Sequence, residues 1–246
     1  MNTHIIIQAR MGSGRLPGKI LKDLCGFPML YHVIERCRKS KLAERVILAT
    51  TVEAQDNSTA DFCSNHGIDY MRGSENDVLS RYYETARKFH SSVIVRVTAD
   101  CPLIDPLIID SCIQKFKEEK DVDYLSNVSV RTFPRGLDVE VFSFNALQRA
   151  YKEAKELYER EHVTPYIWEN KKREFKIGES VRASSEYARN YRLTVDYPED
   201  FELMKKIYEA LYKEGTIIDA REAFVFLNHH PEIARINAHC EQRPVQ

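Results

Sequence analysis

Short apolar runs alternate with amphipathic segments through the first half of the chain. Runs of the length and composition of buried strands occupy residues 4–9, 45–51, 68–71 and 92–97. Apolar residues recur at helical spacing in residues 29–40, 56–65 and 76–89. Asp105 and Pro106 open one more helix, because Asp caps a helix and Pro suits its first turn. This alternation predicts an α/β fold in which a mostly parallel sheet lies between two layers of helices.

The pattern becomes irregular after about residue 125. Residues 130–142 are typical of a β-excursion interrupted by Pro134 and Gly136. The elements expected next are helices at 145–157 and 159–171, strands near 174–182 and 191–195, and helices after residue 198 and at about 218–228. No repeat or linker marks a boundary. We therefore expect one domain over residues 1–246, with a β-insertion at about 128–145 and a helical end at about 198–246.

A glycine-rich segment with the sequence QARMGSGRLPGK follows the first strand, at residues 8–19. Its three cations are Arg10, Arg15 and Lys19. Backbone N–H groups of a glycine-rich loop can turn inward around phosphate oxygens, and fixed cations offset negative charge. The segment indicates a nucleoside triphosphate site. The alternative is a flexible surface loop whose Arg and Lys side chains are solvated.

This segment matches neither of the two common nucleotide-binding motifs. Ile20 follows Lys19, where a P-loop has the Ser or Thr that binds magnesium. Pro17 stands where the dinucleotide-binding fingerprint has its third glycine. The loop therefore predicts phosphate binding without assigning the chain to either class.

Two aspartates each end an apolar run, Asp100 after the strand at 92–97 and Asp196 after residues 191–195. Ligands of α/β sheets bind at the carboxyl ends of strands, and Mg²⁺ there takes one or two carboxylates together with phosphate oxygens. We expect Asp100 and Asp196 to share one Mg²⁺ ion. The alternative is that each caps the helix after it, although Asp105 already serves as a cap after Asp100.

Composition excludes several classes of protein. Charged residues make up 30% of the chain, but the formal net charge is only −1. The chain therefore lacks the overall positive charge that is typical of nucleic-acid-binding proteins. No apolar run approaches about 20 residues and no signal-peptide pattern opens the chain, so neither a membrane span nor secretion is expected. The six cysteines lack zinc or disulfide spacing, which favours reduced thiols in a cytoplasmic protein.

Three motifs in this order and spacing carry a family resemblance: QARMGSGRLPGK, VTADCPLID and LTVDYPEDFEL. They resemble the cytidylyltransferases that activate 3-deoxy sugar acids and nonulosonic acids, most closely the branch called spore coat polysaccharide biosynthesis protein F. Residues 77–83, 134–141 and 160–165 support that branch. The resemblance spans residues 4 to about 210.

The resemblance implies a Rossmann-like, three-layer nucleotide-diphospho-sugar transferase fold with a β-insertion in its second half. It implies that Arg10, Arg15 and Lys19 hold the triphosphate of CTP and that Asp100 and Asp196 bind Mg²⁺. The other nucleotide-binding residues would be Gln8, Ala9, Gly12, Ser13 and Arg81. Thr98 and Ala99 stand where the sugar-acid synthetases usually have Gln-Gly, so contacts with the base and the acceptor are expected to differ.

The activity implied is transfer of CMP from CTP to a sugar acid or related acceptor with release of pyrophosphate, in polysaccharide biosynthesis. The acceptor would be a nonulosonic acid, a smaller carboxylate or a phosphorylated compound. Candidate acceptor-binding residues are Arg135, Asp138, Glu140, Glu161 and His162, which could equally serve structure. The excursion at 130–142 is a candidate arm for a homodimer.

Two other functions remain open from the sequence. Asp121 and Asp123 form the DxD pattern of glycosyltransferases that use a nucleotide sugar. The cation-rich first loop argues against that function, because a nucleotide sugar presents only a diphosphate. The chain could also be a catalytically silent nucleotide-sensing or scaffold subunit.

Overall fold

A computed structural model describes residues 2–242 of the chain. Six strands form one sheet in the order β5-β4-β1-β6-β8-β7. Their bounds are β1 (Thr3–Gln8), β4 (Arg45–Thr51), β5 (Asp69–Gly73), β6 (Val93–Thr98), β7 (Tyr124–Ser126) and β8 (Glu140–Ser143). A small ribbon of β2 (Asp23–Leu24) and β3 (Phe27–Pro28) stands apart from it.

The direction of each strand decides which loops meet at the site. Strands β5, β4, β1 and β6 run parallel, whereas β8 is antiparallel to β6 and β7 is antiparallel to β8. The segment before β8 therefore lies at the edge where β1 and β6 end. The segment before β7 lies at the opposite edge.

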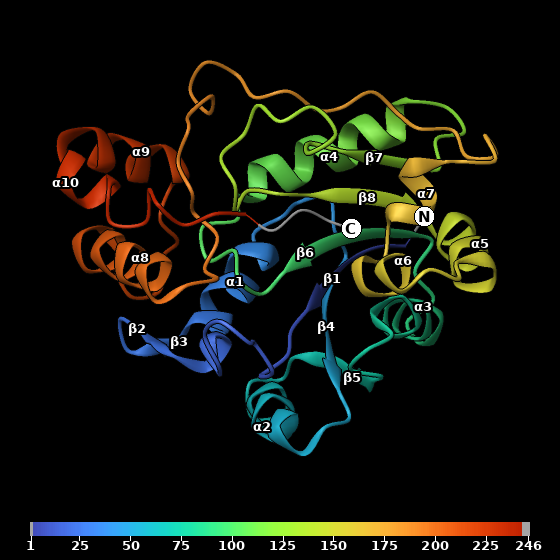
Figure 1. The fold of residues 1–246 in the computed structure, drawn as a ribbon, viewed down its shortest axis with the longest axis horizontal. Helices are drawn as coiled ribbons and strands as arrows, with labels where there is room; N and C mark the ends of the chain where they lie inside the picture. The colour runs from blue at the N-terminus through green and yellow to red at the C-terminus, as the bar shows by residue number, and fades with distance from the viewer. Residues whose placement is uncertain (1, 243–246) are drawn as a thin grey trace.

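Helices cover both faces of the sheet (Figure 1). The hydrophobic core on one face includes α1 (Met29–Arg38), α2 (Asn57–Asn65) and α4 (Pro106–Glu118). The other face is covered by α3 (Val78–Lys88), α5 (Phe144–Glu153), α6 (Leu157–His162) and α7 (Pro165–Glu169). The C-terminal helices α8 (Pro198–Leu211), α9 (Ala220–His229) and α10 (Pro231–Ala234) pack together at one side, on the left of Figure 1. The three-layer α/β fold expected from the sequence is confirmed.

The sequence of β1 is continuously apolar because its side chains are buried on both faces of the sheet. Ile5 and Ile7 point into the core of the α1 and α4 layer, and Ile6 points into the core of the α3 and α5 layer. All three side chains are fully buried. A strand covered on both faces needs an apolar residue at every position rather than at every second one.

Two predicted helix starts are confirmed by their capping contacts. The Asp77 side chain accepts a hydrogen bond from the Ser80 N–H at 2.8 Å, at the start of α3. Asp105 accepts one from the Leu107 N–H at 2.8 Å, at the start of α4. Asp100 therefore does not cap α4, and its carboxylate is free for another role.

The second half departs from the predicted elements. Residues 174–182 and 191–195 form only isolated bridges, Tyr124 with Ile177 and Arg135 with Arg192. The first segment lies along β7, which is three residues long and offers too few partners for a ladder. The helix predicted at 159–171 is divided at Val163, whose φ is +74°, and restarts at Pro165. Of the predicted insertion at about 128–145, only β8 is regular strand, and residues 128–139 form a loop.

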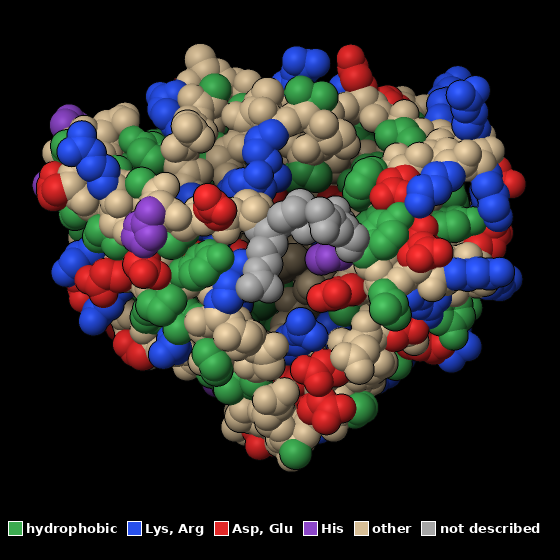
Figure 2. All heavy atoms as spheres, viewed as in Figure 1, with side chains coloured by type: hydrophobic (Ala, Val, Ile, Leu, Met, Phe, Trp, Pro, Cys, Tyr) green, Lys and Arg blue, Asp and Glu red, His purple; other side chains and the backbone are tan. Residues whose placement is uncertain are grey.

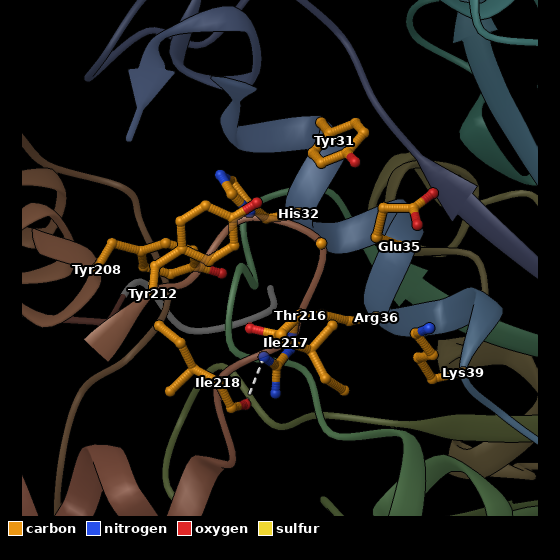
Figure 3. A pocket seen from close by; sticks show the side chains of 11 residues that line it. Tyr31, His32, Glu35, Arg36, Lys39, Tyr208, Tyr212, Thr216, Ile217 and Ile218 are labelled. Carbon is orange, nitrogen blue, oxygen red and sulfur yellow. Dashed lines mark hydrogen bonds between the residues drawn. The ribbon is translucent and has the colours of Figure 1, made fainter. Parts of the chain in front are cut away.

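A fully buried arginine attaches the C-terminal helices to the sheet. Arg36 on α1 donates to the carbonyl oxygens of Leu103, Ile104 and Ile218 at 3.2, 2.5 and 2.6 Å. It lines a small cavity of about 30 Å³ together with the aromatic rings of His32, Tyr208 and Tyr212. Figure 3 shows these side chains around the cavity. That volume suits a single water molecule. In the part of the chain that the structure describes, no helix is both long and apolar enough to cross a membrane.

Candidate active site

A cleft of about 570 Å³ opens at the carboxyl ends of β1 and β6. The face drawn in Figure 2 is hollowed near its middle, where side chains of both charge signs gather. The residues that line the cleft are Gln8, Ala9, Arg10, Ser13, Gly14, Arg15, Lys19, Ile20, Val78, Arg81, Thr98, Ala99, Asp100, Glu161, His162, Asp196 and Gln242. Nucleotide-binding residues predicted from the sequence are thus brought together. Of the predicted nucleotide-binding residues, Gly12 alone is absent from the described lining of the cleft.

Lys19 is the centre of the charged cluster in the cleft. Its ammonium lies 3.0 Å from an oxygen of Asp100 and 3.0 Å from an oxygen of Asp196, and it donates to the Val195 carbonyl at 2.6 Å. The residue is 8% exposed, so the interpretation of a solvated surface lysine is wrong. Burial opposes its charge, but Asp100 and Asp196 outweigh burial and raise the pKa of Lys19.

Backbone geometry brings Lys19 to this position. Gly18, which precedes it, has φ +68°, a conformation that residues with a side chain rarely adopt. Lys19 then begins the 3-10 turn η1 (Lys19–Leu21), and Ile20 packs into the core. The loop folds on itself through Met11, whose carbonyl accepts from the N–H groups of Ser13 and Gly18. Those two N–H groups are therefore occupied within the loop.

Asp100 is held in one orientation by its neighbours. Thr98 Oγ1 donates to Asp100 Oδ1 at 2.5 Å, and Lys19 contacts Oδ2. Burial alone would raise the pKa of Asp100, but the Lys19 charge and the Thr98 hydrogen bond together lower it. The carboxylate is therefore ionised at neutral pH. Cys101 beside it is buried, which raises the pKa of its thiol well above the usual value and leaves it a neutral packing residue.

Arg15 approaches the cluster from the other side of the loop. Its guanidinium lies 2.9 Å from Asp196 Oδ1 and stacks over the Tyr197 ring at 4.8 Å from the centroid. Arg10 is more exposed and pairs with Glu75 at 3.9 Å. Arg15 therefore shares an anion with Lys19, whereas Arg10 pairs with a different one.

Arg81 lines the cleft although it is only 1% exposed. It donates to the Ser74 carbonyl at 2.6 Å, and its Nε has no hydrogen-bond partner among the described residues. Buried polar atoms are normally paired. Nearby, Gln8 Oε1 accepts from Arg96 Nε at 3.2 Å, which leaves the amide NH₂ of Gln8 as the donor.

The five acceptor-binding candidates divide into two groups. Glu161 and His162, at the end of α6, line the cleft. Burial lowers the pKa of His162, so its imidazole is uncharged at neutral pH. The other three candidates, Arg135, Asp138 and Glu140, lie outside the described lining of the cleft.

Those three occupy the segment before and within β8. Asp138 pairs with Arg131 through two contacts of 2.8 and 3.0 Å. Glu140 is buried and bonded to Arg96, Tyr124 and Thr164, so its contacts are structural. Arg135 makes no side-chain hydrogen bond or ion pair with any described residue, and its carbonyl accepts from the Leu193 N–H at 2.8 Å.

The donor set in the cleft suits a hard divalent cation. Asp100 and Asp196 come from separate segments and place oxygens around one cationic atom, the ammonium of Lys19. Carboxylate oxygens are the ligands Mg²⁺ prefers. Both carboxylates meet at Lys19, and their binding of one metal ion stays a prediction. A separate group, Glu199, His239 and Cys240, has ligand atoms within 4.8 Å of one another and lies outside the cleft lining among described residues.

The DxD pattern lies at the wrong edge of the sheet for this cleft. Asp121 and Asp123 precede β7, so they lie at the amino ends of β1 and β6 rather than at their carboxyl ends. Asp123 accepts from the Lys176 N–H at 3.0 Å. Asp123 thus stabilises an edge segment there.

The sequence interpretation missed several residues that shape the cluster. Arg192 contacts both Asp196 and Asp200, and Thr98 orients Asp100. Gln242 reaches the cleft from the C-terminal segment and accepts from Arg192 at 2.9 Å. Local spacing offered no signal for this network, because Arg192 and Asp196 precede α8 and the i, i+4 rule applies only within a helix.

The fold and this cleft define an α/β protein with a charged cleft at the carboxyl ends of its parallel strands. The family model described as cytidylyltransferase matches residues 4–224. The spore coat polysaccharide biosynthesis protein SpsF of Bacillus subtilis (strain 168) is 35% identical over 93% of this chain and 95% of its own length. The chain therefore belongs to the cytidylyltransferase family, whose members are nucleotidyltransferase enzymes.

Solved structures agree with this assignment. A cytidylyltransferase from Leptospira borgpetersenii serovar Hardjo-bovis (strain JB197) is 33% identical, covers 99% of both chains and has a TM-score of 0.87. A CMP:2-keto-3-deoxy-manno-octonic acid synthetase complexed with CTP has a TM-score of 0.65 at 19% identity, over 85% of this chain and 99% of that chain. The second likeness shows the shared fold alone.

Proposed function

We propose that this cytidylyltransferase transfers CMP from CTP to a sugar acid, releases pyrophosphate and depends on Mg²⁺. The observation that carries the proposal is the convergence of Asp100 and Asp196 on Lys19, with Arg15 beside them, in one cleft at the strand ends. Two anions and two cations so arranged can hold a metal–triphosphate complex. The CTP bound to the octonic acid synthetase supports the choice of nucleotide.

In the reaction we propose, an acceptor oxygen attacks the α-phosphorus of CTP while the bond to the β-phosphate oxygen breaks. Transfer of this kind needs positioning and charge neutralisation more than covalent help from the protein. Arg10, Arg15 and Lys19 stabilise negative charge on the departing pyrophosphate. A Mg²⁺ ion held by Asp100 and Asp196 would supply further positive charge at the phosphate oxygens.

The nucleobase would bind near Gln8, Ala9 and Arg81. The NH₂ group of Gln8 and the unpaired Nε–H of Arg81 are both donors, and cytosine offers O2 and N3 as acceptors. The acceptor would enter from the side of Glu161 and His162. The printed name of the Bacillus relative supports a role in surface or spore coat polysaccharide synthesis.

The test is pyrophosphate release from CTP in the presence of a panel of sugar acids, with and without EDTA. We expect release only with CTP, Mg²⁺ and an acceptor, and a CMP-linked product by mass spectrometry. Asp121→Asn serves as the control variant, since that side chain lies at the opposite edge of the sheet. Hydrolysis of a nucleotide sugar instead, or full turnover in EDTA, would overturn the proposal.

Acceptor binding by Arg135 is tested by Arg135→Lys. Arg135 is a half-buried cation at the cleft edge of the sheet without a described partner, and Arg pairs with carboxylate through two parallel bonds that Lys cannot make. We expect the acceptor KM to rise about tenfold while the CTP KM stays nearly constant. Glu161→Gln is expected to show the same asymmetry more weakly. A change in the CTP KM alone would remove Arg135 from the acceptor site.

A further inference from the structure

Asp200 is a fully buried carboxylate that does not line the cleft. It lies in the first turn of α8 and accepts from the N–H groups of Asp196 and Tyr197 at 2.9 and 3.0 Å. It also accepts from Asn237 Nδ2 at 2.7 Å and from two nitrogens of Arg192 at 2.9 and 3.1 Å. Five donors on one carboxylate exceed what capping a helix requires.

Arg192 joins this buried carboxylate to the active-site cluster. While Nε and Nη2 contact Asp200, Nη2 also donates to Asp196 Oδ2 at 3.0 Å. The guanidinium is planar and rigid, so a contact on one edge fixes the direction of the others. Asp200 therefore sets the orientation of Arg192, and Arg192 sets that of Asp196.

The two oxygens of Asp196 consequently have different surroundings. Oδ2 is held by Arg192, which is outside the described lining of the cleft. Oδ1 faces Lys19 at 3.0 Å and Arg15 at 2.9 Å, on the cleft side. If Oδ2 lost its partner, the carboxylate could rotate and place both oxygens against the two cations.

We propose that Arg192 and Asp200 are positioning residues for the transfer reaction, which hold Asp196 so that one carboxylate oxygen is presented to the cleft. This proposal rests on the proposed function, in which Asp196 serves the metal–nucleotide complex. Neither residue contacts the substrate. Each contacts Asp196, which lines the cleft.

The experiment compares Arg192→Lys with the matched control Arg221→Lys. Arg221 forms the same kind of fork with Asp219, through Nε at 3.0 Å and Nη2 at 2.6 Å, at the start of α9 away from the cleft. Arg192→Lys keeps a positive charge but loses the fork. We expect kcat to fall about 10- to 100-fold, a loss typical of a misplaced group, while the CTP KM changes little. Arg221→Lys should leave both constants unchanged.

A double-mutant cycle separates positioning from general destabilisation. In an Asp196→Asn background, Arg192→Lys should cause no further loss of kcat, because the group through which it acts has already been changed. An equal loss in both backgrounds would overturn the proposal, as would normal kcat in Arg192→Lys. Asp200→Asn provides the second variant, with the same expected split between kcat and KM.

The same measurements separate this proposal from the function on which it rests. Wild-type activity of Asp196→Asn would contradict the role of Asp196 in the reaction, and positioning with it. Loss of activity in Asp196→Asn together with normal kcat in Arg192→Lys would contradict positioning alone.

Discussion

At the scale of single residues, the active-site cluster balances charges that come from distant parts of the chain. Lys19 lies between two carboxylates and is nearly excluded from solvent. Removing one member of a buried ion pair costs more than the pair contributes, because the remaining charge stays buried without a partner. Substitutions in the cluster are therefore expected to lower the stability of the protein as well as to affect the proposed reaction.

Lys19→Ala is expected to reduce turnover at least 100-fold and to destabilise the protein by about 3 kcal/mol, since Asp100 and Asp196 lose their shared cation. The affinity of the free protein for Mn²⁺ should rise, because the ammonium no longer neutralises the carboxylates. Urea denaturation and calorimetry measure both effects. The exposed Lys22, changed to Ala, is the control and should leave both values unchanged. Unaltered stability of Lys19→Ala would contradict the burial argument.

Asp100→Asn and Asp196→Asn are each expected to lower turnover about 100-fold, and the double variant is expected to be far less damaged than the product of the two losses. Two residues that serve one ion act as a unit, so their effects are not additive. Steady-state kinetics at several Mg²⁺ concentrations measures this. Independent, multiplying losses would show that the two carboxylates do not act together.

At the scale of secondary-structure elements, the site depends on attachments made far from it. The segment before β8 reaches the cleft edge because β8 runs antiparallel to β6. Gly136, with φ +99°, lets this segment approach Leu193, whose carbonyl carbon would lie 2.4 Å from an added Cβ. Arg36 attaches α1 to the loop after β6 and to the segment before α9.

Arg36→Met is expected to lower the free energy of unfolding by about 3 kcal/mol, because three buried carbonyl groups lose a charged donor. Arg38→Met, on the same helix, is the control. Arg38 is exposed and, among the residues that the structure describes, pairs only with Glu35, so its change should cost less than about 0.5 kcal/mol. Denaturant unfolding of both variants checks this. If Arg36→Met and Arg38→Met had equal free energies of unfolding, Arg36 would not contribute to the attachment of α1 to these segments.

At the scale of the whole molecule, neutral histidines in the interior make folding depend on pH. His4 bonds to Ser91 Oγ at 2.8 Å, and His32 donates from Nε2 to the Leu24 carbonyl at 2.6 Å. Burial lowers the pKa of both below the ordinary value of 6.5. The unfolded chain therefore takes up protons at a higher pH than the folded protein does.

Stability is accordingly expected to be full above about pH 6.5 and to fall as the pH drops from there toward the lowered pKa values of the folded state. Urea unfolding at pH 7.5 and 5.5 measures the loss. In the double variant His4→Gln, His32→Gln the loss should be smaller, since two groups that bind protons in the unfolded chain are gone. A loss as large as in the wild type would assign the pH dependence to other groups.

Local sequence determined much of the fold's first half. The apolar run of β1, the helix start near residue 76, the cap Asp105 and the boundaries of β4 were predictable, because strand period and capping chemistry involve neighbouring residues. The candidate cations and the two aspartates were readable for the same reason, since each ends a strand or follows one. The expected strands at 174–182 and 191–195 failed because a strand also needs a partner of sufficient length.

Tertiary structure alone decided how these groups meet. Lys19 and Asp196 are separated by 177 residues, and their contact depends on the order of strands in the sheet. The link from Asp200 through Arg192 to Asp196 arises from the packing of α8 against the C-terminal segment. The placement of Asp121 and Asp123 away from the cleft follows from the direction of β7. Such long-range pairings depend on which surfaces pack together, and local residue patterns do not specify that choice.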